Sequence, residues 1–152
     1  MNNHLREAMR RSKPDTKRKK VLVFGAFDIL HPGHLNFFEQ AKQYGDFLIV
    51  VIGRDKNIEK IKGQKPINDE NKRLETVKSN SIIDQTVLGY EDDKYRIIKE
   101  LAPDIICLGY DQKAYTEKLE NKLADFGLVT KVVRLKPFHP EKYKSSKLKE
   151  SE

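Results

Sequence analysis

The sequence has few of the features that cross-link a chain or place it in a membrane. Among its 152 residues there is one cysteine, Cys107, which excludes an intramolecular disulfide and any metal site built from several cysteines. The longest uninterrupted apolar run covers residues 47–52, whereas a membrane-spanning helix needs roughly 18 or more apolar residues. No apolar stretch of signal-peptide length stands at the N-terminus, so we expect no secretory export. These absences favour a cytoplasmic protein without a membrane partner.

Positive charge is abundant but unevenly spread. The formal net charge is +7, and residues 1–20 hold eight lysines and arginines against only Glu7 and Asp15. The rest of the chain is nearly neutral, so the basicity belongs to the N-terminal tail and is weak evidence for a nucleic-acid-binding surface. We therefore expect a basic flexible leader over residues 1–19 and one domain over residues 20–152. Nucleic acid is not an expected partner.

Strand and helix patterns alternate along the body of the chain. Short apolar runs typical of buried strands cover 21–24, 47–52, 82–88, 105–108 and 128–135, and helical patterns begin near 35, at Asn68 or Asp69, and near 92, 116 and 147. Residues 54–68 indicate a loop or a short irregular helix. The alternation predicts an α/β fold, a five-stranded parallel sheet with helices on both faces. Ligands of such sheets bind beyond the carboxyl ends of the strands, near the switch in strand order.

The strongest local signal is the segment 25–34, Gly-Ala-Phe-Asp-Ile-Leu-His-Pro-Gly-His, between the first strand and the first helix. Pro32 suits the first helical position, and Gly33 allows a ligand to approach the backbone closely. We expect free N–H groups of that first turn to bind an anion, with His31 and His34 donating to the same phosphates. Phosphoryl and nucleotidyl transfer need such positioning and charge neutralisation. No nearby Cys or Glu completes a zinc site, so we assign no metal ligands.

This segment resembles the His-x-Gly-His signature of the cytidylyltransferase-like superfamily of nucleotidyltransferases, and the similarity extends over residues 21–149. The resemblance implies a Rossmann-like fold and transfer of a nucleotidyl group from an NTP to a substrate phosphate. Pyrophosphate leaves, and a divalent cation, usually Mg²⁺, assists. It implies catalytic roles for His31 and His34, and nucleotide contacts for Gly25, Ala26, Phe27, Asp28 and Gly33. Asp28 could orient a metal ion or His31, or cap its loop. Relatives are often dimers, so a homodimer stays open.

Further segments also resemble family motifs. The basic stretch 60–66 is similar to a loop whose lysine contacts phosphates, which implicates Lys62 in catalysis. Asn71-Lys72-Arg73 resembles a Glu-x-Arg position that supports the substrate end of the site, so Arg73 is assigned to the substrate, as is Arg134 at the end of the last strand. Each position also has a structural alternative, namely a solvated loop, an ion pair, a turn or a helix cap. The remaining nucleotide-binding candidates are Gly109, Asp111, Gln112, Ser145 and Ser146.

Two small single-domain groups of the superfamily fit this length. Glycerol-3-phosphate cytidylyltransferases usually show Arg-Thr-x-Gly-Ile-Ser-Thr before the last helix, and residues 134–139 read Arg-Leu-Lys-Pro-Phe-His instead. The patterns Lys-Gly-x-Lys-Pro, Leu-Gly-x-Asp-Gln and Val-Arg-Leu-Lys resemble the archaeal-type FAD synthetases, although Tyr110 replaces their usual proline and the tail lacks cysteine. The resemblance thus favours AMP transfer from ATP to FMN. Transfer from CTP to glycerol 3-phosphate or another small phosphorylated alcohol stays open, as does a non-enzymatic nucleotide- or RNA-binding module.

Overall fold

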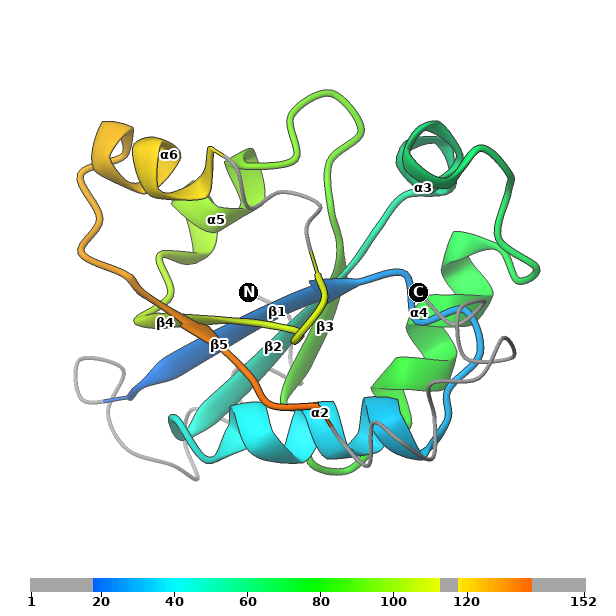
Figure 1. Ribbon diagram of the computed structural model, residues 1–152, viewed down its shortest axis with the longest axis horizontal. Coiled ribbons are helices and arrows are strands. Elements are labelled where there is room, and N and C mark those ends of the chain that lie inside the picture. Colours follow the sequence, from blue (N-terminus) through cyan, green and yellow to red (C-terminus); the bar gives the residue numbers. More distant parts are fainter. Residues whose placement is uncertain (1–17, 113–117, 138–152) are drawn as a thin grey trace.

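The strands form a single parallel sheet. The computed structural model describes residues 18–112 and 118–137 of the chain (Figure 1). The five strands of this part pair in the order β3-β2-β1-β4-β5, and every neighbouring pair is parallel. They are β1 (Lys20–Gly25), β2 (Phe47–Ile52), β3 (Gln85–Leu88), β4 (Ile105–Leu108) and β5 (Lys131–Arg134). The predicted five-stranded parallel α/β sheet is confirmed.

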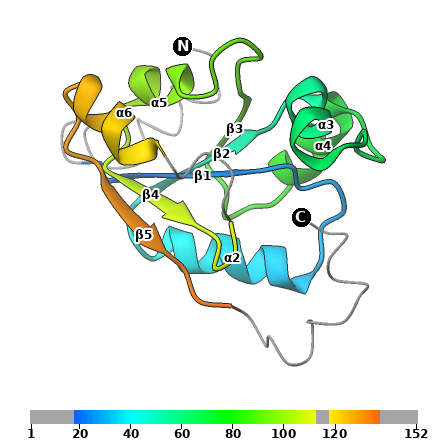
Figure 2. The same ribbon diagram turned by 45° about the horizontal axis from the view of Figure 1, so that its top comes forward.

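Helices cover both faces of the sheet, as predicted. They are α2 (Pro32–Lys42), α3 (Asp55–Lys62), α4 (Glu70–Lys78), α5 (Arg96–Leu101) and α6 (Leu119–Asp125). Helix α2 lies below the sheet in Figure 1, and α5 and α6 lie above it, an arrangement that Figure 2 repeats from a second angle. Helix α4 joins the α2 side, because its Val77 belongs to the same buried cluster as Phe38 of α2.

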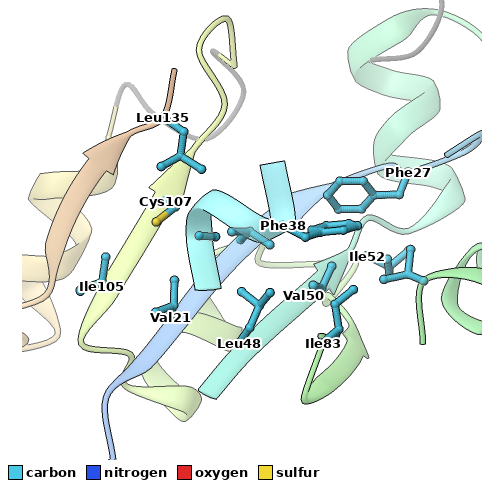
Figure 3. Close-up of a cluster of buried hydrophobic side chains, with 13 residues drawn as sticks. Val21, Phe27, Phe38, Leu48, Val50, Ile52, Ile83, Ile105, Cys107 and Leu135 are labelled. Atoms are coloured by element: carbon cyan, nitrogen blue, oxygen red, sulfur yellow. The ribbon is translucent and has the colours of Figure 1, made fainter. Parts of the chain in front are cut away.

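The central strands are buried on both sides, which explains their uninterrupted apolar sequences. Successive side chains of a strand point to opposite faces of the sheet. On β1, Val21 and Val23 therefore belong to the buried cluster between the sheet and α2. Leu22 and Phe24 belong to the buried cluster between the sheet and helices α5 and α6. Figure 3 shows the first cluster, with Phe38 of α2 lying over the sheet.

Several boundaries differ from the sequence prediction; helix α5, for example, begins at Arg96 and not near residue 92. Residues 55–62 form a regular helix, α3, where we expected a loop or an irregular turn. Only Ile58 of this helix is buried, so the apolar periodicity that reveals a helix is too weak to detect. Strand β3 begins at Gln85 and not near residue 82, because the Ile83 N–H still bonds the Asn80 carbonyl in a turn. Of the two predicted caps of α4, Asp69 is the one that accepts the Lys72 N–H.

The described body begins just before β1. Arg18 is buried, and its guanidinium lies 4.4 Å from the ring centroid of Phe47, so packing begins two residues before the predicted boundary of the domain. Most of the predicted leader and the predicted last helix lie outside the described residues. None of the helices described between residues 18 and 137 is both long and apolar enough to cross a membrane.

Candidate functional site

The β1–α2 loop, residues 26–31, leaves the carboxyl end of the central strand. Strand β1 lies between β2 and β4 in the sheet, and the order of strands reverses between β1 and β4. In a parallel sheet this reversal opens a crevice beyond the strand ends, since the connections on its two sides run to opposite faces. The predicted nucleotide and catalytic residues of segment 25–34 thus lie at the edge where this fold places ligands.

Phe27 turns its ring under the loop and supports one of the two histidines. Its φ of 51° is a left-handed conformation that costs a bulky residue about 1–3 kcal/mol. The buried ring packs 5.1 Å from the ring centroid of Phe38 and meets His34 edge-on at 5.4 Å, contacts that offset this cost. A Cβ at Gly25 would lie 2.5 Å from the Phe27 ring, so glycine is required there.

His31 and His34 form a stacked pair at the start of α2. Their ring centroids lie 3.9 Å apart with an interplanar angle of 24°. His31 is the N-cap of α2, and its Nδ1 accepts the Gly33 N–H at 3.0 Å. Because Nδ1 accepts, the proton of the neutral His31 ring lies on Nε2, which is then the donor. A Cβ at Gly33 would lie 2.8 Å from Cε1 of His31, so the glycine allows this cap to form.

The first turn of α2 corrects one prediction. We expected free backbone N–H groups to bind an anion there, but the turn already engages them. Pro32 has no N–H, Gly33 donates to the His31 ring, and the N–H groups of His34 and Leu35 both donate to the His31 carbonyl oxygen. The positive end of the helix dipole remains, and the two imidazoles stay the predicted donors to an anion. A hydrogen bond to an anion at this position would therefore come from the two rings.

Asp28 connects the segment between α3 and α4 to the β1–α2 loop through hydrogen bonds. Its carboxylate accepts the backbone N–H groups of Ile67 at 2.6 Å and Asn68 at 2.8 Å. The Asn68 side-chain amide also donates to the Asp28 carbonyl oxygen at 2.8 Å. Of the roles left open for Asp28, the structure therefore shows a capping role, in which it joins the segment before α4 to the β1–α2 loop.

Arg73 is a buried cation beneath these loops, with no exposed surface. It donates to the carbonyl oxygens of Asn68, Ala26 and Gly53 at 2.9–3.0 Å, and to the Asp55 carboxylate at 2.6 Å. These oxygens come from the segments that follow β1 and β2 and from the segment before α4. The bonds commit the guanidinium to the chain itself, and a direct contact of Arg73 with substrate stays a prediction.

Two further carboxylates tie α3 to α4, and the sequence analysis missed both. The Asp55 N–H donates to Glu70 at 2.9 Å, and the Glu70 N–H donates to Asp55 at 3.2 Å, so each helix caps the other. Arg54 completes the group, because it contacts Glu70 at 3.0 Å and donates to the Gly89 carbonyl oxygen at 2.6 Å. The available signal was an acidic residue in the first turn of both helices.

The turn after β4 lies on the other side of the reversal in strand order. The Gln112 side chain accepts the Gly109 N–H at 3.0 Å and donates to the Phe24 carbonyl oxygen at 3.1 Å, which joins β4 to β1. Arg134 donates to the carbonyl oxygens of Gly109 and Gln112 at 2.7 and 2.9 Å. Arg134 thus braces the predicted nucleotide segment, and its predicted contact with substrate stays a prediction.

The other candidates are placed as follows. Lys62 is exposed at the end of α3, where Gly63 with a φ of 82° ends the helix. Asp111 is exposed in the turn after β4. Ser145 and Ser146 lie outside the described residues, and their contact with the nucleotide stays a prediction.

The described residues offer little to hold a metal ion by themselves. Residues 18–112 and 118–137 contain no group of three or more His, Cys, Asp or Glu side chains arranged for a metal. The carboxylate nearest the histidine pair in sequence, Asp28, has both oxygens engaged by the Ile67 and Asn68 N–H groups. Mg²⁺ commonly binds through phosphates and water with few protein ligands, so this donor set fits an ion that arrives with a nucleotide.

A family model described as cytidylyltransferase-like matches residues 22–151 of the chain. The chain belongs to the cytidylyltransferase-like family. The predicted membership of the cytidylyltransferase-like superfamily is thereby confirmed, and the stacked histidines lie within the matched residues.

Individual relatives of this cytidylyltransferase-like chain narrow the comparison. It is 49% identical to an FAD synthase of Methanohalophilus mahii, in an alignment that covers 76% of this chain and 80% of the relative. It is 46% identical to an FAD synthase of Archaeoglobus profundus, in an alignment that covers 84% of this chain and 81% of the relative. A solved structure described as a lipopolysaccharide core biosynthesis protein from Thermoplasma volcanium superposes with a TM-score of 0.75 at 39% identity, covering 80% of this chain and 98% of that one. A second solved structure, a pantoate-beta-alanine ligase from Francisella tularensis, superposes with a TM-score of 0.54 and covers 91% of this chain and 69% of that one. Because it is only 14% identical, this likeness shows the fold alone.

Proposed function

We propose that this protein transfers AMP from ATP to the phosphate of FMN, giving FAD and pyrophosphate. It is a nucleotidyltransferase by family, and relatives named FAD synthase are 40–49% identical to it over 76–86% of this chain. The observation that carries the proposal is the stacked His31–His34 pair at the positive end of α2, beyond the carboxyl end of β1. A diphosphate leaving group needs positive charge and hydrogen-bond donors at that point.

The reaction requires one bond to form and one to break. An oxygen of the FMN phosphate attacks the α-phosphorus of ATP, and the bond from that phosphorus to the bridging oxygen of the β-phosphate breaks. The electron pair goes to pyrophosphate, whose growing negative charge His31, through Nε2, and His34 stabilise by donation. A divalent cation bound with the triphosphate would neutralise part of the same charge. No nucleophilic side chain is needed.

The other residues hold the two substrates in place. On the β4 side, the Gly109–Gln112 turn takes the ribose and base of ATP, and the hydroxyls of the sugar donate to Asp111. On the β2 side, Lys62 contributes positive charge for phosphate, and Asp28 and Arg73 fix the loops between. We propose that the protein acts as an enzyme of the cytoplasm. We also propose that it forms a homodimer.

One assay separates the candidate functions. The full chain is incubated with Mg²⁺ and either ATP or CTP, together with FMN or glycerol 3-phosphate, and pyrophosphate and product mass are measured. We expect pyrophosphate and FAD only from ATP with FMN. CDP-glycerol from CTP would instead establish cytidylyl transfer, and uptake of nucleotide without pyrophosphate would establish a binding module.

A further inference from the structure

Exposed large apolar side chains are concentrated on segments that leave the carboxyl edge of the sheet. The described residues include seven exposed large hydrophobic side chains, and four of them lie on such segments. Ile29 follows β1 and Tyr110 follows β4, while Ile61 and Ile67 belong to the α3–α4 region that follows β2. Exposure of apolar surface to water is unfavourable, and a ligand that covers this surface removes the cost, so this distribution indicates an apolar part in the ligand.

Asp28 brings two of these side chains to the same place. Ile67 is 78% exposed and Ile29 is 54% exposed. The Ile67 N–H is bonded to the Asp28 carboxylate at 2.6 Å, and Ile29 is the next residue after Asp28. The hydrogen bond fixes the Ile67 backbone while its side chain stays in solvent. Ile67 is therefore held near Ile29, which stands two residues before the catalytic His31 in the sequence.

The same region carries three exposed lysines. Lys60, Lys62 and Lys65 are all exposed within a few residues of Ile67. A surface that combines three lysines with an outward isoleucine is complementary to a ligand with a phosphate at one end and an apolar ring at the other. The region lies on the β2 side of β1, away from the β1–β4 reversal where the nucleotide of the other substrate is expected.

We propose that Ile67, with Ile29 beside it, is a specificity-determining surface that receives the flat isoalloxazine ring of FMN. This inference rests on the proposed function and names the part of the site that distinguishes its acceptor. FMN can cover Ile67 with its ring while its phosphate meets Lys60 and Lys65. Glycerol 3-phosphate offers the phosphate alone and leaves Ile67 in water, so the surface favours the flavin over a small phosphorylated alcohol.

The test compares Ile67→Ser with two matched variants in the full chain. Ile67→Met keeps an apolar side chain, and Val129→Ser makes a similar change at a fully exposed position just before β5, at the opposite edge of the sheet. For each protein, steady-state FAD formation gives the KM for FMN and for ATP, and quenching of flavin fluorescence gives the affinity for FMN without turnover. Thermal unfolding confirms that each variant is folded.

We expect Ile67→Ser to raise the KM and the dissociation constant for FMN about tenfold while the KM for ATP changes less than about twofold. Ile67→Met and Val129→Ser should both stay near the parent protein. An unchanged affinity for FMN in folded Ile67→Ser, with the parent still making FAD, would overturn this inference and leave the proposed function intact. A parent protein that neither binds FMN nor makes FAD would refute the proposed function, and this inference with it.

Discussion

Arg73 supports the loops around the site from below, and its replacement by methionine should be severely destabilising. Methionine has a similar length but no donors, so the carbonyl oxygens of Ala26 and Gly53 and the carboxylate of Asp55 lose their partner. Removing one member of a buried ion pair costs about 3–5 kcal/mol of unfolding free energy. The Asp55 side chain is 33% exposed, so water can rehydrate it, and we expect a loss near about 3 kcal/mol.

Urea unfolding followed by circular dichroism measures this loss directly, and a thermal scan should show a midpoint roughly 6–12 °C lower. Arg96→Met is the matched control, because Arg96 forms an exposed ion pair with Asp92 at 3.5 Å and stacks on the Tyr90 ring. The control should lose no more than about 1 kcal/mol. An Arg73→Met protein as stable as the control would refute the supporting role assigned to this cation.

Three further predictions concern the histidines, the basic segment and the cysteine. His31→Asn keeps an acceptor for the helix N-cap but removes the imidazole, so turnover should fall about 100-fold or more with little loss of stability. His34→Ala should lower turnover by a similar factor. Near-normal turnover in both variants would exclude the phosphate role. Lys62→Ala should raise the KM for ATP, while the urea midpoint stays unchanged because the side chain is exposed; unaltered kinetics would remove Lys62 from the site. Burial raises the pKa of the Cys107 thiol to about 12, so at pH 8 the thiol is protonated and iodoacetamide should label it only after unfolding, a result that mass spectrometry decides.

The architecture was predictable because the central strands are uninterrupted apolar runs in the sequence. A strand covered on both faces must be apolar at every position, and residues 47–52 meet that condition along their whole length. Helix α3 was not predictable by the same reasoning, since it buries only Ile58 and depends on a cap supplied by Glu70 from the next helix. Periodicity detects burial, and it does not detect stabilisation by polar groups from elsewhere in the chain.

The sequence predicted which residues lie at the site better than it predicted the hydrogen bonds that these residues form. The spacing of His31 and His34 indicated a pair, and the structure stacks their rings. The sequence did not reveal that His31 occupies the first-turn N–H groups with its own ring and carbonyl oxygen. Nor did it reveal that Arg73 is buried, because the oxygens that neutralise it come from segments up to 47 residues away. Such tertiary contacts leave no local pattern.

A crystal structure with the α,β-methylene analogue of ATP, which cannot transfer its AMP, tests the central claim most directly. The account predicts that Nε2 of His31 and the ring of His34 lie within hydrogen-bonding distance, about 3 Å, of the oxygens of the terminal diphosphate. Electron density that places this diphosphate elsewhere, with both imidazoles turned away from it, would contradict the account.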